Sequence, residues 1–110
     1  MVNMMKALVF TAPHTFEYRD VPRPEPAPDE VLVEVKACAI CGSDVHGSSG
    51  ENGRRIPPLV MGHEASGTIA QLGEAVQSWA VGDRVTFDST EYCGHCWFCT
   101  HGMHNLCARR

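Results

Sequence analysis

Four cysteines fall close together near the end of the chain, in the stretch "EYCGHCWFCTHGMHNLC" that spans 91–107. Gaps of two, two and seven residues separate Cys93, Cys96, Cys99 and Cys107. A Cys-x-x-Cys turn brings two sulfurs within about 4 Å of each other, and four such sulfurs complete a tetrahedral shell around Zn²⁺. Four thiolates leave no position open for a substrate. The spacing therefore predicts a structural zinc site in this segment, which we call the cysteine lobe.

Three other interpretations of the cysteine lobe stay open. Two disulfides would suit an oxidising compartment, whereas clustered thiols in a reducing one favour a metal. An iron–sulfur cluster uses cysteines at the first two gaps, but the bacterial pattern continues with a gap of three and a proline, where this chain has a gap of seven and Ala108. A nucleic-acid-binding zinc ribbon would need basic residues, and the lobe has none before Arg109.

Three histidines also lie in the cysteine lobe: His95, His101 and His104. One of them could replace a thiol as a metal ligand. Because four sulfurs already fill a tetrahedral shell, we expect all three to be exposed polar side chains instead.

Composition sets broad limits on the partners of this chain. Its 110 residues are 44% hydrophobic and 20% charged, which fits one globular domain with a modest core. The net charge of −4 gives no basic stripe for nucleic acid or an anionic membrane. No apolar run approaches the roughly 20 residues of a membrane helix, and the start lacks the features of a secretory signal. We expect a cytoplasmic protein without nucleic-acid or membrane partners.

Short apolar runs between closely spaced turns predict a mainly β fold, a barrel or sandwich. Prolines at every second position from Pro22 to Pro28 make 21–30 an extended loop, and 47–58 is a second loop rich in glycine and proline. A turn or short helix follows position 40, where Ser43 and Asp44 can cap it. No strand–GxGxxG–helix unit is present. The expected strands are 5–10, 14–20, 31–40, 66–73 and 83–87.

The segment 31–40 has the clearest alternation of apolar and polar residues. Its small and branched residues at 31, 33, 35, 37 and 39 share one face, and Glu34 and Lys36 share the other. This pattern predicts a half-buried strand. A lone cysteine near the end of a strand is usually a small buried hydrophobe, and we expect Cys38 to be one.

A second set of metal-competent residues lies upstream of the cysteine lobe. It comprises Cys41 in "CGSDVH" and His63 with Glu64 in "GHE". A cysteine, a histidine and a carboxylate supply at most three protein ligands. Such a site leaves one position open for water or substrate, as in catalytic zinc sites.

These residues together resemble a known family. The stretch "GHEASGTIAQLGEAV", from Gly62 to Val76, fits the zinc alcohol dehydrogenase pattern G-H-E-x₂-G-x₅-G-x₂-V. "CGSDVH" and the four spaced cysteines occur in the same family's order. From Met5 onward the chain is similar to the N-terminal GroES-like catalytic domain of a zinc-dependent medium-chain dehydrogenase. Gly42, with "RIPPLVMGHE", resembles the sorbitol (polyol) and threonine dehydrogenase branch.

The resemblance implies a role for each residue around the second set. Cys41 and His63 would ligate a catalytic zinc, and Glu64 would be either a third ligand or a supporting carboxylate. Asp44 would orient the imidazole of His63 and fix its tautomer.

The resemblance also implies a proton path and a reaction. Ser43 would hydrogen-bond the hydroxyl of the substrate and pass its proton towards His46, through the ribose of the cofactor, to water. This role is compatible with helix capping. Zinc would lower the pKa of an alcohol or polyol, which would then give a hydride to NAD(P)⁺. A histidine that titrates near neutral pH suits the outer end of such a path.

Finally, the resemblance implies an organisation for the chain. Residues 1–110 would form part of the GroES-like domain, with the structural zinc lobe at 91–107 and without the Rossmann domain that binds NAD(P). We therefore expect an incomplete barrel with open strand edges, a chain that is inactive alone, and a small alcohol or polyol as substrate of a full-length enzyme that can form a homo-oligomer. The alternative is a standalone zinc-binding module or pseudoenzyme without catalysis.

Overall fold

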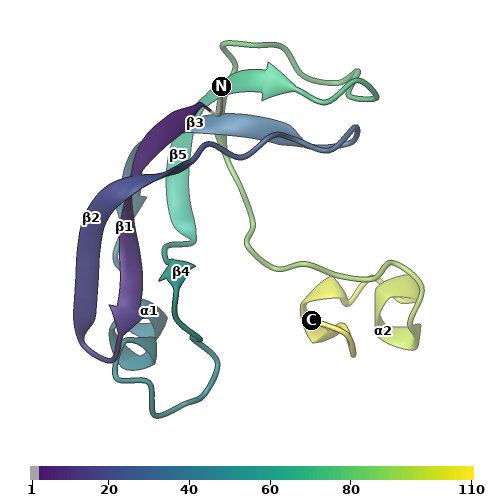
Figure 1. Cartoon of the computed structure of the whole chain (residues 1–110). Helices are drawn as coiled ribbons and strands as arrows, with labels where there is room; N and C mark the ends of the chain where they lie inside the picture. Colours follow the sequence, from purple (N-terminus) through teal and green to yellow (C-terminus); the bar gives the residue numbers. More distant parts are fainter. Residues whose placement is uncertain (1–2) are drawn as a thin grey trace.

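The computed structural model describes residues 3–110, which form two small antiparallel sheets and a separate lobe (Figure 1). The first sheet has the order β2-β1-β4 and the second has the order β3-β5-β6. The strands are β1 (Met4–Ala12), β2 (Thr15–Pro22), β3 (Val31–Ala39), β4 (Leu59–Val60), β5 (Glu64–Leu72) and β6 (Arg84–Thr86). The helices are α1 (Gly42–Gly47), α2 (Trp97–Thr100) and a 3-10 turn, η1 (His104–Leu106).

The hairpin of β1 and β2 supplies much of the small core. Its two-residue turn includes His14, which adopts a φ of 57°. Val9 and Phe10 of β1 are buried, at 3% and 0% exposure. The ring centroids of Phe10 and Phe16 lie 5.5 Å apart across the hairpin. This aromatic contact fixes the register, because a slip by one residue would turn the buried face of β1 outward.

The second sheet leads into the candidate site, which lies where β3 ends and β5 begins. Ala65 and Ile69 of β5 face inward, with exposures of 7% and 2%. Gly67 lies between them, and a Cβ atom there would lie 2.1 Å from the backbone oxygen of Glu34. Only glycine lets β3 approach β5 this closely.

One expectation for β3 is wrong: its apolar face is not buried towards the end of the strand. Val35 is 54% exposed, and Ala37 and Ala39 are also exposed. Cys38 is exposed as well, so it is not the small buried hydrophobe that we expected. A bulge between Val35 and Ala37 interrupts the alternation, and no described element forms a layer over this part of the sheet. Each sheet has only three strands, which fits the expectation of an incomplete barrel.

The other expected elements correspond well to those observed. All five expected strands are present within about two residues of the expected ends, which is the usual uncertainty of such boundaries. The short helix α1 follows β3 as expected. The two-residue strand β4 and the short helices of the lobe were not expected. Among the residues described, no helix is both long and apolar enough to cross a membrane.

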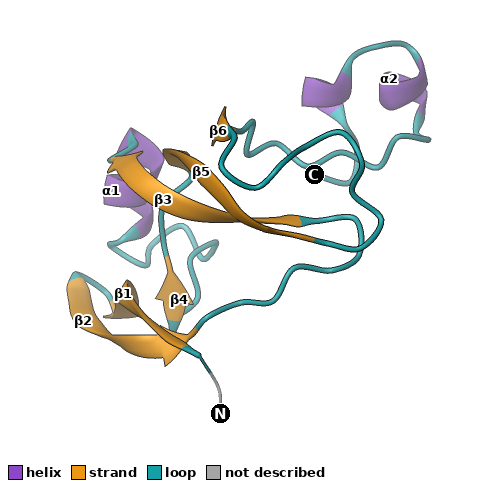
Figure 2. Ribbon diagram, turned by 90° about the horizontal axis from the view of Figure 1, so that it is seen from above, coloured by secondary structure: helices purple, strands orange, loops and turns teal. Residues whose placement is uncertain are grey.

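The cysteine lobe stands away from both sheets (Figure 2). Two views agree that a single segment after β6 leads to it, drawn in green in Figure 1. The lobe contains only α2, η1 and turns. A lobe with so little regular structure needs stabilisation besides backbone hydrogen bonds.

Candidate functional site

The structure brings the four sulfurs of the cysteine lobe together. The ligand atoms of the thiol cluster, Cys93, Cys96, Cys99 and Cys107, all lie within 4.8 Å of one another. Sγ of Cys99 lies 3.5 Å from that of Cys96 and 4.0 Å from that of Cys93. These distances lie on either side of about 3.8 Å, the edge of a tetrahedron with Zn–S bonds of about 2.3 Å. The thiol cluster therefore fits a single zinc ion.

Backbone N–H groups point at several of these sulfurs. The N–H of Cys96 donates to Sγ of Cys93, and the N–H groups of Cys93 and Arg109 donate to Sγ of Cys107. Hydrogen bonds from the backbone at Ala108 and Cys99 lower the pKa of Cys96 to about 6, and similar bonds lower the pKa of Cys107. Burial raises the pKa of Cys99 to about 12. Donors of this kind stabilise thiolates, the form in which cysteine binds metal.

The structure favours neither disulfides nor histidine ligands in the cysteine lobe. All six cysteines are free, and the sulfur distances are far longer than the roughly 2.05 Å of a disulfide. His95, His101 and His104 are exposed and lie outside the thiol cluster. Two of them stack on aromatic rings. The ring centroids of His101 and Trp97 are 4.3 Å apart, and those of His104 and Tyr92 are 4.1 Å apart.

A second group of ligand atoms, the mixed cluster, joins Cys41, His63 and Glu64 within 4.8 Å. Cys41 lies between the end of β3 and the start of α1, and Glu64 begins β5. Gly62 has a φ of 117°, which directs the chain into this corner just before His63. Cys41 and His63 are half-buried, whereas Glu64 is exposed. A thiol, an imidazole and a carboxylate match the donor types that zinc takes in open sites.

Asp44 lies behind the mixed cluster and connects it to α1. Its Oδ2 atom accepts a hydrogen bond from the N–H of Cys41 at 3.2 Å, so Asp44 caps the helix as expected. Its Oδ1 atom lies 3.3 Å from Nδ1 of His63. Oδ1 is buried and has no hydrogen-bond partner among the described residues, so its contact with His63 is a close electrostatic approach rather than an aligned hydrogen bond. The carboxylate thus faces one ring nitrogen of His63 and leaves Nε2 for the mixed cluster.

Ser43 takes part in the mixed cluster rather than in capping. Its hydroxyl lies 3.3 Å from Sγ of Cys41 and 3.3 Å from Nε2 of His63. His46 lies one turn further along α1, is exposed, and makes no side-chain hydrogen bond with a described residue. The structure therefore brings Ser43 to the cluster and leaves the imidazole of His46 at the surface.

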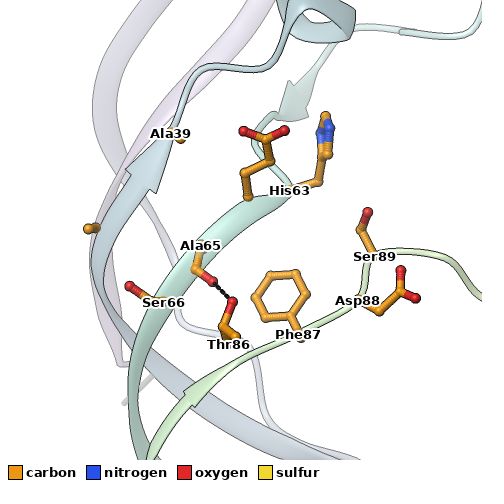
Figure 3. A pocket seen from close by; sticks show the side chains of 10 residues that line it. Ala39, His63, Ala65, Ser66, Thr86, Phe87, Asp88 and Ser89 are labelled. Atoms are coloured by element: carbon orange, nitrogen blue, oxygen red, sulfur yellow. Dashed lines mark hydrogen bonds between the residues drawn. The ribbon is translucent and has the colours of Figure 1, made fainter.

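A hollow of about 680 Å³, the first hollow, opens beside the mixed cluster (Figure 3). Figure 3 shows His63 at one end and Phe87, Asp88 and Ser89 along one wall. The hydroxyl of Thr86 donates to the backbone oxygen of Ala65 at 2.9 Å and holds this wall against β5. The hollow gives a small molecule access to His63.

Sequence reasoning missed one residue behind this site, Arg55. Its Nη2 atom lies 3.8 Å from Oδ1 of Asp44. The side chain crosses α1 directly over Gly47, where a Cβ atom would lie 2.5 Å from Cγ of Arg55. Gly47 and Arg55 carry no spacing signal, because their contact depends on how the 47–58 loop folds back over α1.

The family model described as the alcohol dehydrogenase GroES-like domain matches residues 27–110. A sorbitol dehydrogenase from Halalkalibacterium halodurans is 44% identical over 109 residues, which are 96% of this chain and 32% of that protein. An L-threonine 3-dehydrogenase from Rhizobium etli is 45% identical over 111 residues, which are 97% of this chain and 32% of that protein.

A solved structure has a similar fold over most of this chain. The cobalt- and zinc-bound thermostable alcohol dehydrogenase from Pyrobaculum aerophilum superimposes with a TM-score of 0.89 at 29% identity. The match covers 96% of this chain and 33% of that one. The chain thus spans about a third of the length of the relatives that it matches.

Proposed function

The chain belongs to the alcohol dehydrogenase GroES-like domain family, and from that premise we propose that it carries the zinc-binding part of an oxidoreductase that transfers a hydride from an alcohol or polyol to NAD(P)⁺. Residues 1–110 would form part of the N-terminal catalytic domain, with a structural zinc lobe at 91–107. A separate domain would bind the dinucleotide, and the 110 residues alone would be inactive.

The observation that carries the proposal is the mixed cluster beside the first hollow. Cys41, His63 and Glu64 offer three ligand atoms within 4.8 Å, and His63 also lines the hollow. Three protein ligands leave room for an oxygen atom of a substrate, whereas the four thiols of the lobe do not. The two clusters therefore suit different tasks.

Zinc bound at the mixed cluster would polarise the hydroxyl of an alcohol and lower its pKa. The residues of the chain would hold and move the proton. The hydroxyl of Ser43, 3.3 Å from Nε2 of His63, lies where it can accept a hydrogen from a substrate that enters beside His63. His46 lies three residues further on the same helix and is open to solvent, so it would release the proton to water. Asp44 would keep His63 in one tautomer.

The thiol cluster would hold a second zinc with a purely structural role. Its four sulfurs join the segment at 93–99 to Cys107, in a lobe whose only regular elements are α2 and η1. Cys99 and Cys107 are the buried hydrophobic residues of this lobe, each 5% exposed. Metal bonds would supply the stabilisation that such a small core cannot.

The proposed function is tested with Co²⁺ in the mixed cluster of the chain. Addition of a polyol or a simple secondary alcohol should change the visible absorption of this cobalt, because the open position takes a hydroxyl. The same addition to a His63→Ala variant should change nothing. An alcohol response that survives in His63→Ala would contradict the assigned site.

A further inference from the structure

A second hollow adjoins the mixed cluster and gathers positive charge. Four of the nine lysine and arginine residues of the chain line it, although the net charge of the chain is −4. Two come from the loop at 47–58 and two follow the thiol cluster. Glu91 is the acidic residue among its lining. We call this the arginine hollow, and its basic residues are Arg54, Arg55, Arg109 and Arg110.

Most of these arginines have no protein partner. Arg55 approaches Asp44 at 3.8 Å, and its buried Nε atom has no hydrogen-bond partner. Among the described residues, the side chains of the other three form no ion pair. Elsewhere Lys6 and Arg19 pair with acidic neighbours. Like charges gathered in one hollow repel one another, so an anion bound there would relieve that repulsion.

The arginine hollow shares a wall with the catalytic residues. Ser43 and His63 line it, and His63 also lines the first hollow. A molecule whose hydroxyl lies beside Ser43 would therefore place atoms a few bonds away among the guanidinium groups. The anion and the reacting hydroxyl would belong to one small molecule.

The residue type indicates which anion fits. Guanidinium groups bind phosphate through paired hydrogen bonds, and arginine is favoured for this geometry over lysine. Four arginines face Glu91 and the Asp44 that approaches Arg55, and the remaining excess of two positive charges suits a doubly charged phosphate better than a singly charged carboxylate. We propose that the arginine hollow binds a phosphate group, and that the alcohol oxidised here is a phosphorylated polyol. This inference rests on the proposed function for the reaction itself.

The thiol cluster also positions two of the four arginines of the arginine hollow. The N–H of Arg109 donates to Sγ of Cys107 at 3.4 Å, so Arg109 and Arg110 directly follow the last thiol of the cysteine lobe. Phosphate binding should therefore need a lobe that holds its metal.

The test is calorimetric titration of the zinc-loaded chain with sn-glycerol 3-phosphate at low ionic strength, with glycerol as the uncharged probe. We expect the phosphate to bind and glycerol to give no measurable heat. The double variant Arg54→Gln/Arg109→Gln should weaken phosphate binding at least about tenfold, because each lost guanidinium removes charge-assisted hydrogen bonds. The matched control is Arg84→Gln, an exposed arginine on β6 outside the hollow, which should stay within about twofold of the parent. Equal binding by the double variant and the control would overturn the inference.

Two further measurements separate the possible sources of failure. The first is titration with inorganic pyrophosphate, which stands in for the diphosphate of a dinucleotide. If pyrophosphate binds the chain at least tenfold more tightly than glycerol phosphate does, the proposal that the arginine hollow binds the phosphate of a substrate is overturned. Cobalt loading of the mixed cluster, read from the visible spectrum of the same samples, tests the proposed function separately. Normal cobalt loading without arginine-dependent phosphate binding overturns this inference alone.

Discussion

His63 turns its Nδ1 atom towards Asp44, whose Oδ1 atom lies 3.3 Å away. The same carboxylate accepts the N–H of Cys41 through Oδ2. One side chain therefore contacts both the imidazole of His63 and the backbone of Cys41, two members of the mixed cluster. Asp44 is only 13% exposed, so this arrangement is shielded from water. Carboxylates in this position fix the tautomer and orientation of metal-binding histidines.

Replacing Asp44 should weaken metal binding at the mixed cluster without affecting the lobe. We expect Asp44→Ala to lower the affinity of that cluster for Co²⁺ by about 10–100-fold, the usual effect of removing such a carboxylate. Asp20→Asn is the matched control, because Asp20 pairs with Lys6 at the surface. Competition with a chelator, followed by the visible spectrum, measures both. Unchanged affinity in Asp44→Ala would show that the contact with His63 has no role in metal binding.

The thiol cluster should hold its metal independently of the mixed cluster. Cys96→Ser removes one of four sulfurs and should release about one zinc per chain. Cys38→Ser is the control, because Cys38 is exposed and lies outside both clusters. Metal analysis of freshly purified protein gives the counts. Iron with acid-labile sulfide in place of zinc would favour the iron–sulfur interpretation of the spacing.

Zinc binding at the lobe should release protons and grow stronger as the pH rises. Burial raises the pKa of Cys99 to about 12, so this thiol keeps its proton at neutral pH until a metal displaces it. The lowered pKa of Cys96, about 6, means that this thiol contributes less to the pH dependence above pH 7. Each displaced proton makes the apparent affinity rise about tenfold per pH unit. Calorimetry in buffers of different ionisation enthalpy counts the protons, and an affinity that is flat between pH 6.5 and 8 would contradict the prediction.

Gly67 should be intolerant of any side chain. A Cβ atom there would lie 2.1 Å from the backbone oxygen of Glu34, so β3 and β5 would have to separate. We expect Gly67→Ala to lower the free energy of unfolding by about 1–3 kcal/mol, as for other overpacked positions. Gly42→Ala is the control, because a Cβ atom there meets nothing within 4 Å. Urea unfolding of the zinc-loaded chain compares the two, and equal midpoints would refute the steric explanation.

Local patterns predicted the strands well but not their burial. The alternation in 31–40 correctly indicates β3, and it shows which residues share a face. It cannot show whether another layer covers that face, and Val35 is 54% exposed because none of the described elements does so. Cys38 was misjudged for the same reason.

The candidate site was likewise predicted only in part from the sequence. The cysteine spacing predicted the thiol cluster, because short-range turns alone bring those sulfurs together. The residue types also grouped Cys41 with His63 and Glu64 as a possible open metal site, and the resemblance to the family assigned a role to each of them. The approach of Arg55 to Asp44 was not predictable, since it depends on how a long loop folds over Gly47.

The central claim is that the chain holds two metal ions in different surroundings, one closed by four thiolates and one left open for a reactant. Co²⁺ titration of the metal-free chain, followed by visible and near-ultraviolet absorption, tests it most directly. We predict two equivalents of bound cobalt with two distinguishable spectra. Cys96→Ser should remove the strongly thiolate-like spectrum, and His63→Ala should remove the other. A single equivalent in an all-thiolate environment, unaffected by His63→Ala, would contradict the account.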